Sequence, residues 1–368
     1  MNLSKSLQSI KNILKAVGLF AVLMLPVSCR SQNTNATGNI DNGKHASVAY
    51  QNPVMAHDFP DPAVLRAPDG WIYAYATQTP SDNGMINIQV AKSRDLIDWQ
   101  RSGDALPVKP RWADQTQSFW APHVLYDSTQ KTYYMYFSSN RNGKDGHCIG
   151  VATAQNPEGP FKDSGSPLIC GDGFVDIDPM AFDDPQTGKK LLYWGSGIQP
   201  IKVRELADDR VHFKEGSTIQ NLVAPGNGES YDNLVEGGWI HYKNGYYYLF
   251  YSGDNCCGDQ AHYAVMVARS KQTKGPYTRL GETGDADSSV ILKKSNTWIA
   301  PGHNSILTDD NGQDWILYHA IDPNRHYIEG THNDRRVLMI DPVHYENGWP
   351  VINNGKPSEI DTLTPDFN

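Results

Sequence analysis

The chain has 368 residues, and its 32 Lys and Arg against 41 Asp and Glu give a formal net charge of −9. This acidity argues against nucleic acid as the main partner, because binding a phosphate backbone requires a basic surface. An apolar content of 39% excludes disorder throughout, while 32 Gly and 23 Pro spread without a short period exclude a collagen-like or long helical protein and favour an all-β chain.

The first 28 residues are typical of an export signal. Lys5, Lys11 and Lys15 precede an apolar run over residues 16–25, and no acidic residue occurs before Asp41. The run is too short for a comfortable membrane span, which distinguishes a signal from a transmembrane helix.

The end of this segment, Leu25-Pro26-Val27-Ser28-Cys29, resembles a bacterial lipoprotein signal with Cys29 as the lipidated first residue. An ordinary cleaved signal with an incidental cysteine is the alternative. Residues 29–50 are rich in Asn, Thr, Ser and Gly, which predicts a flexible tether. We therefore expect an exported protein, periplasmic or on the surface of a bacterium, that reaches the membrane only through a lipid anchor at Cys29.

From residue 51 onward, one pattern recurs five times, roughly every 60 residues. Each copy has a short polar or Pro/Gly motif, an apolar strand, a turn, an aromatic strand and a third strand. The aromatic strands are expected at residues 71–76, 133–137, 191–194, 246–251 and 315–319. The pattern predicts a single five-bladed β-propeller of four-stranded antiparallel blades over residues 51–368, with a two-sheet sandwich as the runner-up. The segment 352–368 would close the ring or lie along its surface.

Four further cysteines, Cys148, Cys170, Cys256 and Cys257, show no C-x-x-C pair and no Cys/His spacing of a structural zinc site. In an exported protein, a bridge between Cys148 and Cys170 and a bridge between the adjacent Cys256 and Cys257 are both open, and buried free thiols are the alternative.

Equivalent positions at the start of each innermost strand converge at one end of a propeller channel. We predict these positions to be Asp61, His123, Asp178, Glu236 and His303. A single Asp-Pro or Glu-Gly is a common turn feature, but three acids in three repeats would meet in one cavity, where like charge and burial raise carboxyl pKa values. Paired carboxyls that divide into an ionised base and a protonated acid can cleave a glycosidic bond, and a third acid can orient the proton donor.

At these residues the chain resembles the family 43 glycoside hydrolases, over about residues 52–352. The matching segments are Phe59-Pro60-Asp61-Pro62, Phe119-Trp120-Ala121-Pro122, Ile177-Asp178-Pro179, Glu236-Gly237, residues 246–252 and Pro301-Gly302-His303-Asn304-Ser305. The family consists of five-bladed propellers that hydrolyse arabinose- and xylose-containing plant polysaccharides with inversion at the anomeric carbon. The resemblance implies that Asp61 is the general base that activates water, Glu236 the general acid and Asp178 the residue that orients and tunes the acid.

The resemblance also implies ligand contacts. His303 is similar to an axial histidine that contacts a calcium ion or ordered waters in many members, so a calcium ion in the channel is the one cofactor expected; a metal-free channel histidine is the alternative. Trp120, directly before the second motif, is expected to stack on a sugar ring. His123 stands where members often have an aspartate, and it is a less secure candidate for a sugar contact.

Two further candidates for substrate contacts lie before the first motif and before the last strand of the repeats. Asp58 lies three residues before Asp61 and either contacts substrate or stabilises a turn. Arg335 and Arg336 approach the last strand, where the family often places a basic residue near the cleft. We choose Arg336, although the sequence alone does not decide which of the two points inward.

The preferred function is that of an exo-acting α-L-arabinofuranosidase, since Cys256-Cys257, His262-Tyr263 and Arg269-Ser270 resemble the arabinan-active members of the family. Endo-1,5-α-L-arabinanase and β-xylosidase remain alternatives, because the loops around the cleft separate them. A catalytically silent carbohydrate-binding propeller is an alternative of another class. The expected partner is a plant cell-wall oligosaccharide or polysaccharide, and we expect a monomer.

Overall fold

The computed structural model describes residues 50–195, 197–226 and 231–367. The predicted export signal (residues 1–28), the lipidated Cys29 and the tether up to residue 49 lie outside these residues. Within the described part of the chain, no helix is long and apolar enough to cross a membrane. Regular structure there is almost entirely β-strand, with the short 3₁₀ segments η1 (Leu280–Glu282), η2 (Pro323–Arg325) and η3 (Asn353–Gly355).

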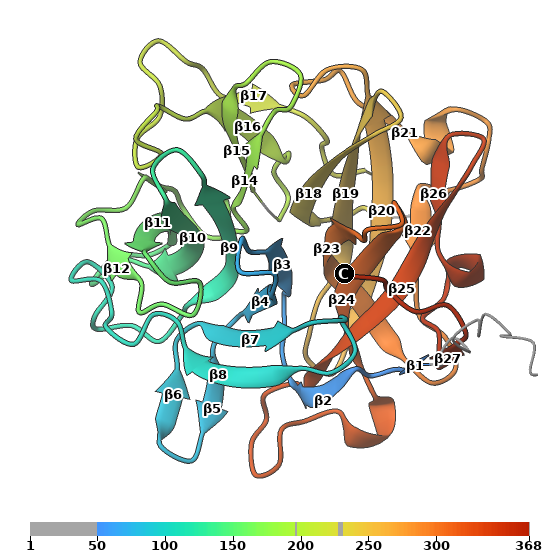
Figure 1. The fold of residues 1–368 in the computed structure, drawn as a ribbon, viewed down its shortest axis with the longest axis horizontal. Coiled ribbons are helices and arrows are strands. Elements are labelled where there is room, and N and C mark those ends of the chain that lie inside the picture. Colours follow the sequence, from blue (N-terminus) through green and yellow to red (C-terminus); the bar gives the residue numbers. More distant parts are fainter. Residues whose placement is uncertain (1–49, 196, 227–230, 368) are drawn as a thin grey trace, which may run out of the picture. The chain divides into compact units, whose positions relative to one another are not determined.

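The strands form five antiparallel sheets, the blades, arranged around a central axis (Figure 1). From the channel outward, blade I contains β3 (Ala63–Arg66), β4 (Ile72–Ala76), β7 (Gln89–Ser93) and β8 (Gln100–Asp104). Blade II contains β9 (Trp120–Asp127), β10 (Thr132–Asn140), β11 (His147–Ala154) and β12 (Lys162–Asp163), with β13 (Ile169–Cys170) beside β11. Blade III contains β14 (Met180–Asp183), β15 (Lys190–Trp194), β16 (Lys202–Glu205) and β17 (Gln220–Asn221).

The last two blades are the largest. Blade IV contains β18 (Val235–Lys243), β19 (Tyr246–Asn255), β20 (His262–Ser270) and β21 (Thr278–Arg279), with β22 (Val290–Leu292) beside β20. Blade V contains β23 (Ile299–Thr308), β24 (Asp314–Ile321), β25 (Arg336–Glu346) and β2 (Met55–Asp58), with β26 (Trp349–Val351) beside β25. A separate hairpin of β5 (Thr79–Ser81) and β6 (Gly84–Ile86) extends from blade I. The innermost strands contact one another in the closed order β3, β9, β14, β18, β23 and back to β3, which confirms the predicted five-bladed propeller.

The ring is closed by the N-terminal end of the folded body. The strand β2 precedes blade I in the sequence but supplies the outer strand of blade V, while β1 (Tyr50–Gln51) pairs with β27 (Ile360–Asp361) near the C-terminus. The side chain of Asn52 bonds both the N–H and the C=O of Ile340. Tyr50 is 2% exposed, so this part of the chain is packed into the propeller.

Strand composition follows from position within a blade. Every residue of β4 and β24 is buried, because the middle strands lie between two neighbouring blades and both of their faces are covered. Their sequences are accordingly mostly apolar and aromatic instead of alternating, with Asp314 and His319 as the polar residues of β24. The tight hairpin between β18 and β19 uses Asn244-Gly245, whose φ angles of 52° and 76° suit a type I′ turn.

Both disulfides that the sequence left open are formed. Cys148 joins Cys170 across β11 and β13, and Cys256 joins Cys257 just after the end of β19.

Candidate active site

Each blade has a residue with a left-handed backbone at the start of its innermost strand or just before it. The φ angles are 56° at Asp61, 43° at Ala121, 56° at Asp178, 60° at Gly237 and 40° at His303. Residues other than glycine rarely adopt this conformation, and such backbones concentrate at functional sites. These five residues are the equivalent positions of the repeat.

Side chains from the preceding blade hold these turns in place. At four blade junctions, a side chain near the end of a blade's second strand, or just after it, accepts the backbone N–H of the turn residue in the next blade. The pairs are Thr77 with Ala121 (2.9 Å), Ser138 with Asp178 (2.9 Å), Ser252 with His303 (2.8 Å) and His319 with Asp61 (3.1 Å). At the junction of blades III and IV, the N–H of Gly237 instead donates to Oδ2 of Asp178 at 3.1 Å. At this junction, the carboxylate of Asp178 thus accepts the bond that a hydroxyl or an imidazole accepts at the other four.

This register corrects the sequence alignment in two blades. In blade II the equivalent of Asp61 is Ala121, two residues before His123, and in blade IV it is Gly237, one residue after Glu236. The sequence alignment followed the charged side chains, whereas the fold repeats a backbone conformation. As a result, Glu236 holds the position that Trp120 holds in blade II.

Asp61 is surrounded by groups that favour its ionised form. Nη1 of Arg336 donates to Oδ1 at 3.0 Å, and Oγ1 of Thr77 donates to Oδ2 at 2.5 Å. Because Thr77 already accepts the N–H of the next blade, its hydroxyl proton is directed at Asp61. Burial alone would raise the pKa of Asp61, but the positive charge of Arg336 outweighs burial and holds this pKa far below its usual value.

His319 contributes mainly by position. Its Nδ1 accepts the backbone N–H of Asp61, so this nitrogen carries no proton for Oδ1 of Asp61, 3.3 Å away. Burial lowers the pKa of His319 to about 4, in agreement with a neutral ring. We therefore regard Arg336 and Thr77 as the groups that keep Asp61 ionised.

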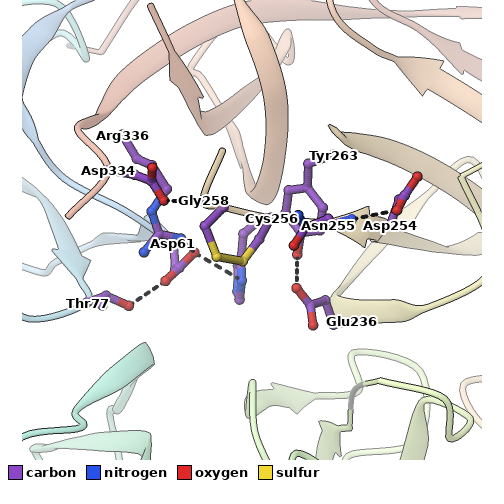
Figure 2. The surroundings of a disulfide bond; sticks show 12 residues. Asp61, Thr77, Glu236, Asp254, Asn255, Cys256, Gly258, Tyr263, Asp334 and Arg336 are labelled. Carbon is purple, nitrogen blue, oxygen red and sulfur yellow. Dashed lines mark hydrogen bonds and ion pairs between the residues drawn. A yellow bond between two sulfur atoms is a disulfide. The ribbon is translucent and has the colours of Figure 1, made fainter. Parts of the chain in front are cut away.

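The other two acids lie in a different environment. Burial raises the pKa of Asp178 well above its ordinary value, and the negative charges of Glu236 and Asp61 raise it further. The hydroxyl of Tyr263 donates to Oε1 of Glu236 at 2.6 Å (Figure 2). Burial and like charge therefore favour a proton shared by the pair Asp178 and Glu236. An ionised carboxylate opposite a proton-bearing pair can perform acid–base hydrolysis.

Tyr263 also connects the two sides of the site. Its ring is stacked on the ring of His319, with centroids 5.9 Å apart and planes 9° from parallel. A side chain at Gly302 would overlap the ring of Tyr263, so the glycine is required for this packing.

His303 lies between the carboxylates of blades I and III. Its Nδ1 is 3.6 Å from Oδ1 of Asp61 and 3.9 Å from Oδ2 of Asp178. Burial lowers its pKa, which favours the neutral ring.

The residues around His303 do not fit a calcium ion held by protein side chains. Calcium takes six to eight oxygen ligands, mostly carboxylates and carbonyls. Among the described residues, no group of three or more His, Cys, Asp or Glu is arranged to hold a metal ion. The next residue, Asn304, has both side-chain polar atoms buried without a hydrogen-bond partner, but an amide is neutral and suits water as well as an ion.

Trp120 lies on an aromatic surface of blade II. Its ring is 4.5 Å from that of His147 and 6.3 Å from that of Phe174, which is 55% exposed. Since Trp120 and Glu236 hold equivalent positions, this surface lies at the same end of the channel as the acids.

His123 is placed deeper and is a packing residue. It is 5% exposed, its ring lies 5.2 Å from that of Trp239, and its Nδ1 accepts the N–H of Ala181 at 3.3 Å. It lines a hollow of about 520 Å³ together with later residues of the inner strands, such as Leu65 and Phe182. Burial lowers its pKa to about 3, so the ring is neutral. The sugar contact considered for His123 is therefore not retained.

The structure separates the two arginines of the last strand. Arg336 points at Asp61, whereas Arg335 donates to the carbonyl of Ala56. Asp58 accepts the backbone N–H of Arg336 at 3.0 Å, which supports the arginine at the start of β25. Burial raises the pKa of Asp58 to about 6 despite the partial opposition of Arg336.

Three contributing residues, Thr77, Tyr263 and His319, were missed as site residues by the sequence analysis. A signal for two of them exists, because a small polar or imidazole residue directly follows an apolar or aromatic strand in Ala76-Thr77, Phe137-Ser138, Tyr251-Ser252 and Tyr318-His319. Tyr263 carries no such repeated signal.

Comparison with known proteins agrees with this architecture. The family model described as "Glycosyl hydrolases family 43" matches residues 50–350. The extracellular exo-α-(1→5)-L-arabinofuranosidase ArbA of Cellvibrio japonicus is 29% identical over 321 residues, which cover 80% of this chain and 86% of the relative. The extracellular endo-α-(1→5)-L-arabinanase 1 of Bacillus subtilis is 29% identical over 304 residues, which cover 79% of this chain and 86% of the relative. A solved structure of Cellvibrio cellulosa α-L-arabinanase complexed with arabinohexaose superposes with a TM-score of 0.65 at 25% identity, covering 80% of this chain and 95% of that chain.

Proposed function

This chain belongs to glycosyl hydrolase family 43, and from that premise we propose that it is an exo-acting α-L-arabinofuranosidase that removes terminal arabinofuranose from arabinan with inversion. The observation that carries the proposal is the division of charge in the site. Arg336 keeps Asp61 ionised, while Asp178 and Glu236 retain a proton. A base and an acid are thereby available at the same pH.

In the proposed reaction, Asp61 accepts a proton from a water molecule as the water oxygen bonds to the anomeric carbon. Glu236 donates its proton to the glycosidic oxygen as the bond from that oxygen to the anomeric carbon breaks. Tyr263 orients the carboxyl of Glu236. The nearby carboxyl of Asp178 disfavours ionisation of Glu236, so that Glu236 keeps its proton until the glycosidic bond breaks. The products are a free arabinose of inverted configuration and the shortened chain.

Arabinan as substrate is supported by the names of the relatives and by the arabinohexaose complex of the Cellvibrio arabinanase. Trp120 and its aromatic neighbours would supply the stacking surface for a sugar ring, and Arg336 a charged group beside the bound sugar. The endo-arabinanase of Bacillus subtilis is as similar as the exo-acting enzyme, so endo-arabinanase is the second candidate.

The test is hydrolysis by residues 30–368 of aryl α-L-arabinofuranoside, aryl β-D-xylopyranoside and linear arabinan, with Asp61→Asn as the blank. We expect release from the arabinofuranoside and only monosaccharide from arabinan. Oligosaccharides from arabinan with inert aryl substrates would establish the endo mode, and release from none of the three would refute a furanosidase of this specificity.

The acid is tested separately with Glu236→Gln. An aryl leaving group needs little protonation, so this variant should lose less activity on the aryl arabinofuranoside than on arabinobiose. Equal losses on both substrates would contradict the assignment of Glu236.

We also propose that the protein is exported and held at a membrane by lipid on Cys29, since residues 1–29 have the features of a lipoprotein signal. Full-length protein should fractionate with the membranes when it is expressed in a bacterium. The Cys29→Ala variant should be found in the soluble fraction. Membrane association of the Cys29→Ala variant would contradict the anchor.

A further inference from the structure

The disulfide between Cys256 and Cys257 lies beside the catalytic residues, since Cys256 packs against the same apolar cluster as Tyr263. In Figure 2 its sulfur atoms project into the space between Asp61 on one side and Glu236 with Tyr263 on the other. Both cysteines are only half-buried. The bridge therefore presents surface toward the cleft.

The turn that carries the disulfide is attached to both sides of the site. Cys256 packs against an apolar cluster that includes Tyr263, the residue bonded to Glu236. Two residues after Cys256, the N–H of Gly258 donates to Oδ2 of Asp334 at 2.7 Å, and Asp334 precedes Arg336 by two residues. The turn thus spans from the side of the acid to the side of the base.

A role in fold stability does not explain this bridge. A disulfide restricts the unfolded chain according to the length of the loop that it closes. Cys148 and Cys170 are 22 residues apart, whereas Cys256 and Cys257 are adjacent and close no loop. The Cys148–Cys170 bridge can therefore stabilise the fold by restricting the unfolded chain, whereas the Cys256–Cys257 bridge cannot.

The chemistry of the cleft indicates another role. The side chains that contact or approach Asp61 and Asp178 are charged or polar: Thr77, Arg336 and His303. Sugar sites also need apolar surface against the C–H faces of the ring. One such surface is Trp120 in blade II. In a ring of five blades, the place opposite blade II is the junction of blades IV and V, where the disulfide lies.

We propose that the Cys256–Cys257 disulfide is a sugar-binding surface of the active site, which packs its polarizable sulfur atoms against the terminal furanose between Asp61 and Glu236. This inference rests on the proposed function and adds a specificity-determining contact to it. A thioether or disulfide sulfur is soft and forms apolar contacts without requiring a hydrogen bond. Serine in its place has nearly the same size but a hydrated hydroxyl.

The decisive experiment measures sugar binding apart from turnover. Calorimetric titration with arabinotriose compares Glu236→Gln with the same protein carrying Cys256→Ser and Cys257→Ser. We expect Kd to increase about tenfold when the disulfide is removed, as for the loss of a modest apolar contact. In the otherwise wild-type background, KM should rise by a similar factor while kcat changes by less than about threefold.

Two controls separate this contact from general effects. The double variant Cys148→Ser and Cys170→Ser lacks the bridge that closes a loop, so its Tm should fall while its Kd for arabinotriose stays unchanged. A reductant opens both bridges, and it should leave the Kd of the Cys256→Ser and Cys257→Ser protein unchanged, because the Cys148–Cys170 bridge does not contribute to sugar binding.

The alternative is that the turn only positions Tyr263 and thereby Glu236. In that case the double serine variant would lose kcat, shift the basic limb of its pH profile and keep its KM, which would overturn the proposal. An unchanged Kd in a protein whose wild type hydrolyses arabinan would overturn this inference alone. A wild type inactive on arabinan would instead refute the proposed function, and with it the contact to a furanose.

Discussion

Asp61 and Asp178 occupy equivalent positions in blades I and III, yet their pKa values move in opposite directions. Both have a φ of 56°, both are buried, and the backbone N–H of each is held by a side chain of the preceding blade. Arg336 and Thr77 contact the carboxylate of Asp61. The carboxyl of Asp178 receives the N–H of Gly237 and faces the negative charge of Glu236.

The difference shows how one repeated turn supplies two kinds of acid. The blade repeat determines where each carboxyl lies, because it fixes the backbone and the bond to the next blade. Residues that do not repeat determine its charge, because Arg336 comes from β25 and donates a hydrogen bond to Asp61. Variants that remove individual contacts of Asp61, Asp178 and Glu236 test whether the position and the charge of each carboxyl are determined separately.

The largest effect is expected from Arg336→Gln. Without the guanidinium, burial is left to dominate and the pKa of Asp61 should rise, so that less of the base is ionised. We expect kcat/KM at neutral pH to fall about 10²-fold or more and the acid limb of the pH profile to move to higher pH.

Arg335→Gln is the matched control, since this neighbouring arginine bonds the carbonyl of Ala56 and leaves Asp61 untouched. It should keep both the rate and the acid limb. If the two variants behaved alike, the ionisation of Asp61 would not depend on the specific contact to Arg336.

A somewhat smaller effect is expected from Asp178→Asn. Removal of the negative neighbour lets the remaining carboxyl lose its proton at lower pH, so the basic limb should move down while the acid limb stays. The rate at the optimum should fall about 10²-fold. A basic limb that did not move would show that Asp178 acts only through its bond to Gly237.

Asp176→Asn provides the comparison for that variant. Asp176 lies two residues away and accepts the indole N–H of Trp194 at 2.7 Å. The amide oxygen of the variant can still accept the indole N–H, so the change removes mainly the negative charge 3.9 Å from Nζ of Lys202. It should lower Tm slightly and leave the basic limb in place.

The hydroxyl of Tyr263 is expected to contribute about tenfold to kcat. Tyr263→Phe keeps the ring stacked on His319 but removes the 2.6 Å bond to Glu236. The loss should be larger on arabinobiose than on the aryl arabinofuranoside, because proton donation matters more there. Tyr318→Phe removes a bond of the same 2.6 Å length to Asp341, outside the catalytic site, and should lower Tm without changing kcat.

Sequence repetition accounts for the part of the site that could be predicted. Asp61, Asp178 and His303 were found because their motifs recur with the blades, and the structure gives all three the same left-handed turn. Glu236 was identified as an acid but aligned one residue out of register. Its chemistry was visible in the sequence, while the backbone conformation that defines the repeat was not.

The unpredicted features belong to segments that do not repeat. Arg335 and Arg336 could not be distinguished, because adjacent residues of a strand point to opposite sides and a one-residue error in phase exchanges them. The closure of blade V by β2 was also missed, since the four residues Met55–Asp58 carry no motif of their own. Its position depends on pairing with β25, almost 280 residues away in the chain.

The smallest effect concerns stability and a third buried carboxyl, Asp341. Its bonds come from two uncharged groups, the hydroxyl of Tyr318 and the N–H of Ser358, and burial raises its pKa from 3.8 to about 6. A raised carboxyl pKa favours folding at low pH, and this contribution is lost as the pH rises through about 6. Asp341→Asn removes the titration, so the variant should gain about 2–3 kcal/mol relative to wild type between pH 4 and pH 7.

Urea unfolding of both proteins at several pH values in that range measures the difference, and kcat/KM on the aryl arabinofuranoside should stay the same. Parallel stability profiles would mean that Asp341 is ionised in the folded protein despite its burial. A convergence of the profiles toward low pH would instead show that burial without a cation is sufficient to raise a carboxyl pKa in this propeller. The raised pKa of Asp178 would then have mainly the same cause, and Asp61 would be the exception that Arg336 creates.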